Sequence, residues 1–287
     1  MPKLAYDLIH PKERTTSVVF ASPHSGRDYP ANFVQRTQLD ALSIRSSEDA
    51  FVDQLFDCAP QFGAPFLRAG APRAFVDLNR GAEELDPALI EGVARQGHNP
   101  RISSGLGVVP RVVSGGREIY RGKMSLEEAK RRIDLYWRPY HDILRRQLNE
   151  AHARFGEAIL VDCHSMPHEA MDTVARGVAR RPEVVIGDRF GASADSEIVE
   201  RIEASFAAAG LSVVRNAPFA GAYVVQSYGR PARRQHAVQI EIDRALYLDE
   251  ARVEPSESFN AFRRLMRQVT AEIAEIGAVG QERLAAE

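Results

Sequence analysis

The chain is built around the stretch Ala158-Ile159-Leu160-Val161-Asp162-Cys163-His164-Ser165-Met166-Pro167. Its first four residues are apolar, a pattern typical of a strand that is buried on both faces in a parallel sheet. The polar residues that follow fall at the carboxyl end of this strand, where open α/β sheets hold their ligand crevices. Because Pro167 cannot continue the strand, the stretch predicts that His164 lies at an edge of the sheet and faces a loop.

Two other segments have a similar form. The mostly apolar residues 17–22 lead into Pro23-His24-Ser25-Gly26, and the apolar strand pattern of residues 237–243 contains Glu241. The first segment therefore predicts a second histidine at a strand end. Two strand-end histidines and a carboxylate within a strand indicate a metal-dependent hydrolase.

Strand patterns alternate with helical patterns along the chain. The expected strands lie at residues 16–22, within 64–80, and at 158–161, 183–187, 211–215, 223–226 and 236–243. The expected helices lie at residues 47–59, 125–155, 195–209 and 256–276. This alternation predicts an α/β fold, a single domain over residues 1–287 with a mixed, mostly parallel sheet flanked by helices.

Two segments have more specific signals. Residues 81–122 are rich in Gly, Pro, Ser and Arg and have little periodicity, so we expect a functional loop or lid rather than a linker. Ser125 and Glu128 form a capping-box pattern at the start of the longest helix. Within that helix, Pro139 should introduce a kink or split it in two.

Composition excludes several classes of protein. The formal charge of −2 over 287 residues indicates neither a nucleic acid nor a membrane surface as partner. No segment approaches the roughly 18 apolar residues of a membrane span. Cys58 and Cys163 do not form a disulfide framework, which fits a reducing cytoplasm. The oligomeric state is left open, a homo-oligomer included.

The histidines and acids suggest a metal site. His24 and His164 are expected at the ends of two strands, and Glu48 and Asp49 at the start of the intervening helix. Two imidazoles, one carboxylate and an open position make a catalytic zinc set. The alternative is that each histidine is an ordinary loop residue, as we expect for His168.

Glu241 has two interpretations. Strand alternation places it on the face opposite Ile240 and Ile242, so it could simply point toward solvent. The functional interpretation makes it a partly desolvated general base beside a metal-activated water.

A third group consists of Arg73, Asn79, Arg80 and Arg111, which fall at strand ends or in the Gly-rich segment. The planar guanidinium pairs bidentately with carboxylates, so the group suits an acidic small-molecule substrate. Each arginine taken alone could equally form a structural salt bridge.

Seven motifs together resemble the N-formylglutamate amidohydrolases, over nearly the whole chain. They are Pro23-His24-Ser25-Gly26, Pro72-Arg73 with Asp77-Leu78-Asn79-Arg80, Gly105-Leu106-Gly107, Pro110-Arg111, Asp162-Cys163-His164-Ser165, Asn216-Ala217-Pro218-Phe219-Ala220-Gly221 and Gln239-Ile240-Glu241. Asp-Leu-Asn-Arg by itself is also similar to the aspartoacylase and succinylglutamate desuccinylase group, which belongs with the zinc carboxypeptidases. The resemblance therefore implies a zinc carboxypeptidase-like fold.

The same resemblance implies roles for the site residues. Zinc would be held by His24, His164 and an acid at position 48 or 49, with Asp49 favoured over Glu48. Glu241 would be the general base. The expected reaction is hydrolysis of an N-formyl acidic amino acid to formate and glutamate, with the arginines binding carboxylates or stabilising the oxyanion.

Three alternatives differ in their chemistry. An N-acyl or N-succinyl amino acid hydrolase would use the same metal with a larger acyl pocket. A metal-free binding protein for acidic amino acids would use only the arginines. A serine hydrolase at Ser25 or Ser165 is disfavoured, because neither lies in a Gly-x-Ser-x-Gly elbow.

Overall fold

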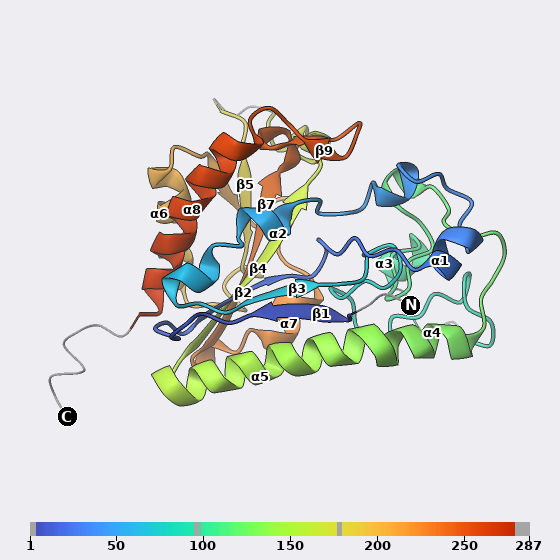
Figure 1. Cartoon of the computed structure of the whole chain (residues 1–287), viewed down its shortest axis with the longest axis horizontal. Helices are drawn as coiled ribbons and strands as arrows, with labels where there is room; N and C mark the ends of the chain where they lie inside the picture. Colours follow the sequence, from blue (N-terminus) through green and yellow to red (C-terminus); the bar gives the residue numbers. More distant parts are fainter. Residues whose placement is uncertain (1–3, 95–96, 98, 177–179, 279–287) are drawn as a thin grey trace, which may run out of the picture.

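A mixed seven-stranded sheet forms the centre of the computed structural model, which describes residues 4–94, 97, 99–176 and 180–278 (Figure 1). Its strand order is β1-β3-β2-β4-β7-β5-β6. The strands are β1 (Tyr6–Ile9), β2 (Val18–Ser22), β3 (Phe66–Ala69), β4 (Ala158–Met166), β5 (Val184–Gly187), β6 (Val213–Arg215) and β7 (Gln235–Asp243). Four of the six neighbouring pairs are parallel, and β1–β3 and β5–β7 are antiparallel. The predicted α/β fold with a mixed, mostly parallel sheet is confirmed.

Helices cover both faces of the sheet (Figure 1). They are α1 (Ala31–Arg36), α2 (Val52–Leu55), α3 (Pro100–Ser103), α4 (Leu126–Arg132), α5 (Arg138–Phe155), α6 (Ser196–Ala208), α7 (Tyr223–Tyr228) and α8 (Phe259–Ile276). Val19 and Ala21 of β2 pack in one core with α5 and α7, whereas Val18 and Phe20 pack in another with α2, α6 and α8. The central strands are therefore buried on both faces, which explains their continuous apolar runs.

The helix expected at residues 125–155 forms in three parts. Ser125 caps α4 by accepting a hydrogen bond from the backbone N–H of Glu128. A π-helical segment, Ile133–Trp137, then joins α4 to α5 directly before Pro139. Proline cannot donate the hydrogen bond that a regular helix requires there. The interruption expected at Pro139 takes the form of this π-helical segment, and the helix is not split in two.

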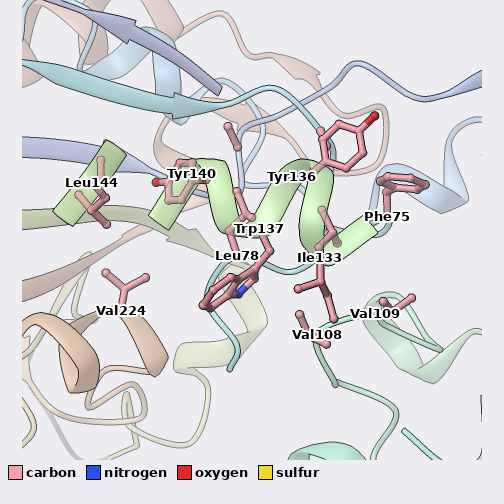
Figure 2. Packing of buried hydrophobic residues seen from close by; sticks show 14 of the residues in the cluster. Phe75, Leu78, Val108, Val109, Ile133, Tyr136, Trp137, Tyr140, Leu144 and Val224 are labelled. Carbon is pink, nitrogen blue, oxygen red and sulfur yellow. The ribbon is translucent and has the colours of Figure 1, made fainter. Parts of the chain in front are cut away.

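The π-helical segment packs tightly on the chain that follows β3. Figure 2 shows Tyr136 and Trp137 beside Phe75 and Leu78. The Phe75 and Tyr136 rings meet edge to face at 5.4 Å between centroids, and Trp137 Nε1 donates a hydrogen bond to the backbone oxygen of Arg80. This contact fixes the backbone of the segment 77–80, which enters the site described below.

Two expectations about local structure were wrong. Residues 223–226 are helical rather than extended, because Val224, Val225 and Tyr228 share one buried helical face. The helix expected at 47–59 begins only at Val52, since Phe51 adopts a left-handed backbone (φ 64°). β4 continues through the polar residues to Met166 and ends before Pro167, so His164 lies near the carboxyl end of the strand, as predicted.

The segment 81–122 is largely irregular, as expected, and includes α3 and a short 3-10 turn, Ser114–Gly116; residues 95–96 and 98 lie outside the described residues. A two-stranded ribbon, β8 (Leu248–Asp249) with β9 (Glu254–Pro255), precedes α8. Among the described helices, none has the length and apolar character needed to cross a membrane.

Candidate active site

The candidate site lies where three neighbouring parallel strands end. β2, β4 and β7 run in the same direction, and His164 on β4 is in register with Glu241 on β7. His24 follows β2 directly. Because parallel strands present their carboxyl ends at one edge of a sheet, residues 24, 164 and 241 converge although up to 217 positions separate them.

His24, Asp49 and His164 form a buried cluster whose potential ligand atoms lie within 4.8 Å of one another. Asp49 Oδ2 lies 2.8 Å from Nδ1 of His164 and 3.4 Å from Nδ1 of His24. The backbone N–H of Asp49 donates to the oxygen of His24, which holds the two residues together. His24 Nδ1 is buried and makes no hydrogen bond to any described residue, so its lone pair is available to a ligand.

Carboxylates orient both histidines from the outside. Asp77 Oδ1 lies 2.7 Å from Nε2 of His24, and Asp162 Oδ2 lies 2.9 Å from Nε2 of His164. Burial opposes ionisation of Asp77, but the nearby charges of His24, Arg73 and Arg80 outweigh it and hold the pKa of this carboxyl well below its usual value. A carboxylate only accepts hydrogen bonds. The proton of His24, whose Nδ1 makes no hydrogen bond to a described residue, is therefore drawn to Nε2. His164 has a carboxylate at each nitrogen, Asp162 at Nε2 and Asp49 at Nδ1, and Nδ1 of both rings faces the centre of the cluster.

The electrostatics of the cluster favour a cation. Burial alone would lower the pKa of His164, yet the carboxylates of Asp162 and Asp49 raise it well above the usual value. Burial likewise opposes the charge on Asp49, but hydrogen bonds to His164 and His24 hold the pKa of Asp49 well below its usual value. Two imidazole nitrogens and one carboxylate, each held in orientation by contacts with further polar groups, fit a metal ion of the zinc type.

Glu48 lies apart from this cluster. Tyr29 donates a hydrogen bond from its hydroxyl to Oε1 of Glu48 (2.5 Å), and Arg45 pairs with the same carboxylate at 3.1 Å. Of the two neighbouring acids, the structure thus brings Asp49, not Glu48, between the histidines.

Glu241 is buried beside His164, so the interpretation that it points toward solvent is wrong. Glu241 lies on the face of β7 opposite Ile240 and Ile242, as strand alternation predicts. The loop 218–222, however, lines the same cavity and covers this face. Gln239 donates a hydrogen bond to Oε1 of Glu241 at 2.9 Å. Burial raises the pKa of Glu241 to about 7, and the negative charge of Asp49 adds to this increase. A carboxylate with such a pKa accepts and returns protons near neutrality.

A cavity of about 640 Å³ opens over these groups. Four arginines line it: Arg73, Arg80, Arg101 and Arg244. Arg111 is not among its lining residues. The guanidinium of Arg111 pairs instead with Asp86 (2.9 Å) and Glu118 (3.5 Å).

The remaining predicted residues hold one another in place. Arg73 pairs with Asp77 at 3.0 Å. Asn79 accepts a hydrogen bond from the N–H of Val224, and its Nδ2 lies 3.2 Å from Nε2 of His164. The cluster, the general-base candidate Glu241 and the predicted carboxylate-binding groups therefore share one cavity, apart from Glu48 and Arg111.

Sequence reasoning missed several residues of the site. Asp77 and Asp162 were quoted only as parts of motifs, although each precedes a candidate residue by two positions. Arg244 directly follows β7 and donates hydrogen bonds to Asp49 Oδ1 and to Ser165 Oγ, each at 3.1 Å. Its position at a strand end was the same signal that identified the two histidines.

Comparison with known proteins gives a consistent result. The family model described as N-formylglutamate amidohydrolase matches residues 16–248. The chain is 32% identical to the N-formylglutamate deformylase of Pseudomonas aeruginosa, over 83% of this chain and 85% of the relative. It is 34% identical to the N-formylglutamate deformylase of Pseudomonas putida, over 81% and 82%. The crystal structure of an N-formylglutamate amidohydrolase from Ralstonia eutropha JMP134 superposes with a TM-score of 0.88 at 33% identity, covering 95% of this chain and 98% of that one.

Proposed function

Because the chain belongs to the N-formylglutamate amidohydrolase family, we propose that it hydrolyses the formamide bond of N-formyl-L-glutamate to give formate and glutamate. The observation that carries this proposal is the placement of Glu241 beside the cluster of His24, Asp49 and His164, within a cavity lined by arginines. A polar cavity of this size accommodates a small dicarboxylate.

We assign the cluster of His24, Asp49 and His164 to Zn²⁺. Nδ1 of each histidine and a carboxylate oxygen of Asp49 would be the ligands, supported by the free, buried Nδ1 of His24. Zinc in such a set supplies Lewis acidity, which lowers the pKa of water and polarises a carbonyl group. Asp77 and Asp162 hold the ring orientations that this assignment requires.

Glu241 carries the proton in this proposal. Gln239 occupies Oε1, which leaves Oε2 to accept a proton from the attacking water. The water oxygen bonds to the formyl carbon, the C–N bond breaks, and Glu241 returns the proton to the departing nitrogen. A pKa raised to about 7 by burial suits both halves of this cycle.

The arginines account for the acidic substrate. Arg73 and Arg80 line the cavity with Asn79 between them in sequence, and we assign them to carboxylate binding and oxyanion stabilisation. We leave Arg111 out of the substrate contacts, because it does not line the cavity and its guanidinium pairs with Asp86 and Glu118. Cys58 and Cys163 are buried free thiols, which supports a reducing cytoplasm as the site of action.

A substrate screen tests the proposal. The zinc-loaded protein is assayed with the N-formyl, N-acetyl and N-succinyl derivatives of Glu, Asp and Gln, and N-formylglutamate should be hydrolysed fastest. Losing one partner of a buried charge pair costs about 2–5 kcal/mol, so kcat/KM for N-formylglutamine should be lower by about 30-fold or more. Faster hydrolysis of N-succinylglutamate would instead identify a desuccinylase-type enzyme. Glutamate binding with neither zinc nor turnover would identify a binding protein.

A further inference from the structure

Arg101 and Arg80 are joined through the backbone of one residue, Leu106. Arg101 lies on α3, and its backbone oxygen accepts a hydrogen bond from the N–H of Leu106 at 2.8 Å. The backbone oxygen of the same Leu106 accepts a hydrogen bond from Nε of Arg80 at 3.0 Å. Both arginines line the cavity. The turn that carries Leu106 therefore sets the position of Arg101 relative to Arg80.

Two glycines fix this turn. Gly105 has a left-handed backbone (φ +80°), which other residues rarely adopt. A Cβ on Gly107 would lie 2.5 Å from the backbone oxygen of Glu84, so only glycine permits this close approach. The turn is thus a packed part of the structure and holds α3 in one position.

The two guanidiniums lack a carboxylate partner. Nε and Nη1 of Arg80 donate hydrogen bonds to the backbone oxygens of Leu106 and Asn79, respectively. Its Nη2 makes no hydrogen bond to a described residue. The side chain of Arg101 has no hydrogen bond or ion pair to any residue in the described part of the chain. By contrast, Arg73 pairs with Asp77 and Arg244 with Asp49.

Burial makes this arrangement unfavourable without an anion. Burial lowers the pKa of the Arg80 guanidinium, the charges of Asp77 and Glu84 partly restore it, and those of Arg73 and Arg101 lower it further. The buried guanidinium of Arg80 and the exposed one of Arg101 are like charges at one cavity, and an anion between them offsets their repulsion. A carboxylate matches the fork of each guanidinium.

The four arginines differ in their distance from the reacting groups. Arg73 and Arg244 pair with Asp77 and Asp49, which contact the histidine cluster, whereas Arg101 contacts none of these groups. In N-formylglutamate the α-carboxylate is bonded to the carbon that carries the scissile nitrogen, and the side-chain carboxylate lies two methylenes beyond that carbon. Arg101, the exposed one of these four arginines, therefore matches the carboxylate that is farthest from the formyl group.

We propose that Arg101, positioned beside Arg80 by the Leu106 turn, binds the side-chain carboxylate of the substrate and makes the enzyme selective for glutamate over glutamine. This inference rests on the proposed function and adds a specificity-determining residue to it. Arg101 contacts the substrate but takes no part in proton transfer. Its removal should therefore affect binding of the charged side chain, not the chemical step.

A kinetic comparison tests this role. In Arg101→Gln, KM for N-formylglutamate should rise so that kcat/KM falls about 10-fold or more, the value of one charge-assisted hydrogen bond, while kcat changes little. With N-formylglutamine, kcat/KM should change less than about 2-fold. Arg101→Lys should recover part of the selectivity. Arg146→Gln, an exposed arginine on α5 paired with Glu150, is the matched control and should behave as wild type. Equal losses on both substrates, or no loss on either, would overturn the inference.

A binding measurement separates this inference from the proposed function. Calorimetric titration with glutamate and with glutamine reports selectivity without requiring turnover. Wild type should bind glutamate about 10-fold or more tightly than glutamine, and Arg101→Gln should lose this preference. An unchanged preference in the variant, or none in wild type, would contradict the role of Arg101. Failure of the wild type to hydrolyse N-formylglutamate would refute only the proposed reaction, because the binding result still decides the role of Arg101.

Discussion

Asp77 Oδ1 lies 2.7 Å from Nε2 of His24, on the side of the imidazole ring opposite Asp49. The same carboxylate pairs through Oδ2 with Nε of Arg73 and accepts a hydrogen bond through Oδ1 from the N–H of Asn79. One buried residue therefore connects a candidate metal ligand to a cavity arginine. Asp77 fixes the tautomer of His24 while it holds Arg73 against the cavity wall.

Asp77→Asn should weaken zinc binding by about 10–100-fold, the usual cost of losing a carboxylate that orients a ligand histidine. The reason is that the amide neither carries the charge nor fixes the proton on Nε2 of His24. Competition with a chelator measures the affinity. Asp53→Asn is the matched control, because Asp53 is also a buried carboxylate paired with arginines but lies outside the cavity. Wild-type zinc affinity in Asp77→Asn would contradict the orienting role.

The choice between the two neighbouring acids can be tested directly. Asp49→Ala should lose bound zinc, as should His24→Ala and His164→Ala, because each removes one of three ligands. Glu48→Ala should retain about one zinc per chain, since Glu48 pairs with Tyr29 and Arg45 instead. Elemental analysis of the purified variants measures the metal. Loss of zinc from Glu48→Ala with retention in Asp49→Ala would reverse the assignment.

His141 makes the stability of the fold depend on pH. Its Nε2 donates to the backbone oxygen of Leu78, its Nδ1 lies 2.9 Å from the hydroxyl of Tyr228, and burial lowers the pKa of His141 to about 3. The unfolded chain, with a histidine pKa of about 6.5, binds a proton that the folded state does not. Stability is therefore full above pH 6.5 and falls as the pH decreases toward 3, by up to about 1.4 kcal/mol per pH unit.

Urea denaturation at pH 7.5 and pH 5.0 checks this prediction. The free energy of unfolding of His141→Gln should change between the two pH values by roughly 2 kcal/mol less than that of wild type. His152→Gln serves as the control, because His152 is exposed and should keep the wild-type difference. An unchanged pH dependence in His141→Gln would show that His141 does not titrate in this way.

The central strands of the sheet could be predicted from the sequence, because a strand that is buried on both faces has a distinct pattern of apolar residues. β2 and β4 contain continuous apolar runs and β7 an alternating pattern of apolar residues, and the rule that ligands lie at the carboxyl ends of parallel strands then brings His24, His164 and Glu241 together. These three residues could thus be placed in one site from the sequence, although they lie far apart in the chain. Local periodicity also gave α6 and α8 within a few residues.

Other features depend on backbone conformations that the residue types do not reveal. Phe51 has a left-handed backbone, and the two adjacent acids contact different groups, Glu48 the side chains of Tyr29 and Arg45 and Asp49 the histidines. The short apolar run at 223–226 fits a strand as well as a helix, and only its packing against the sheet decides. Gly105 lies between Arg101 and Arg111, and its turn places the first in the cavity and the second against Asp86.

The most direct test of the account measures formate release and zinc content on the same preparations of wild type and Glu241→Gln. Wild type should release formate and glutamate in equal amounts from N-formylglutamate. The glutamine side chain keeps the size and hydrogen-bonding reach of Glu241 but cannot accept the proton. Zinc content should therefore remain at about one per chain, while kcat falls by about 10²–10⁴-fold, the range for a positioned general base. Near-wild-type kcat in Glu241→Gln, with zinc retained, would contradict the account.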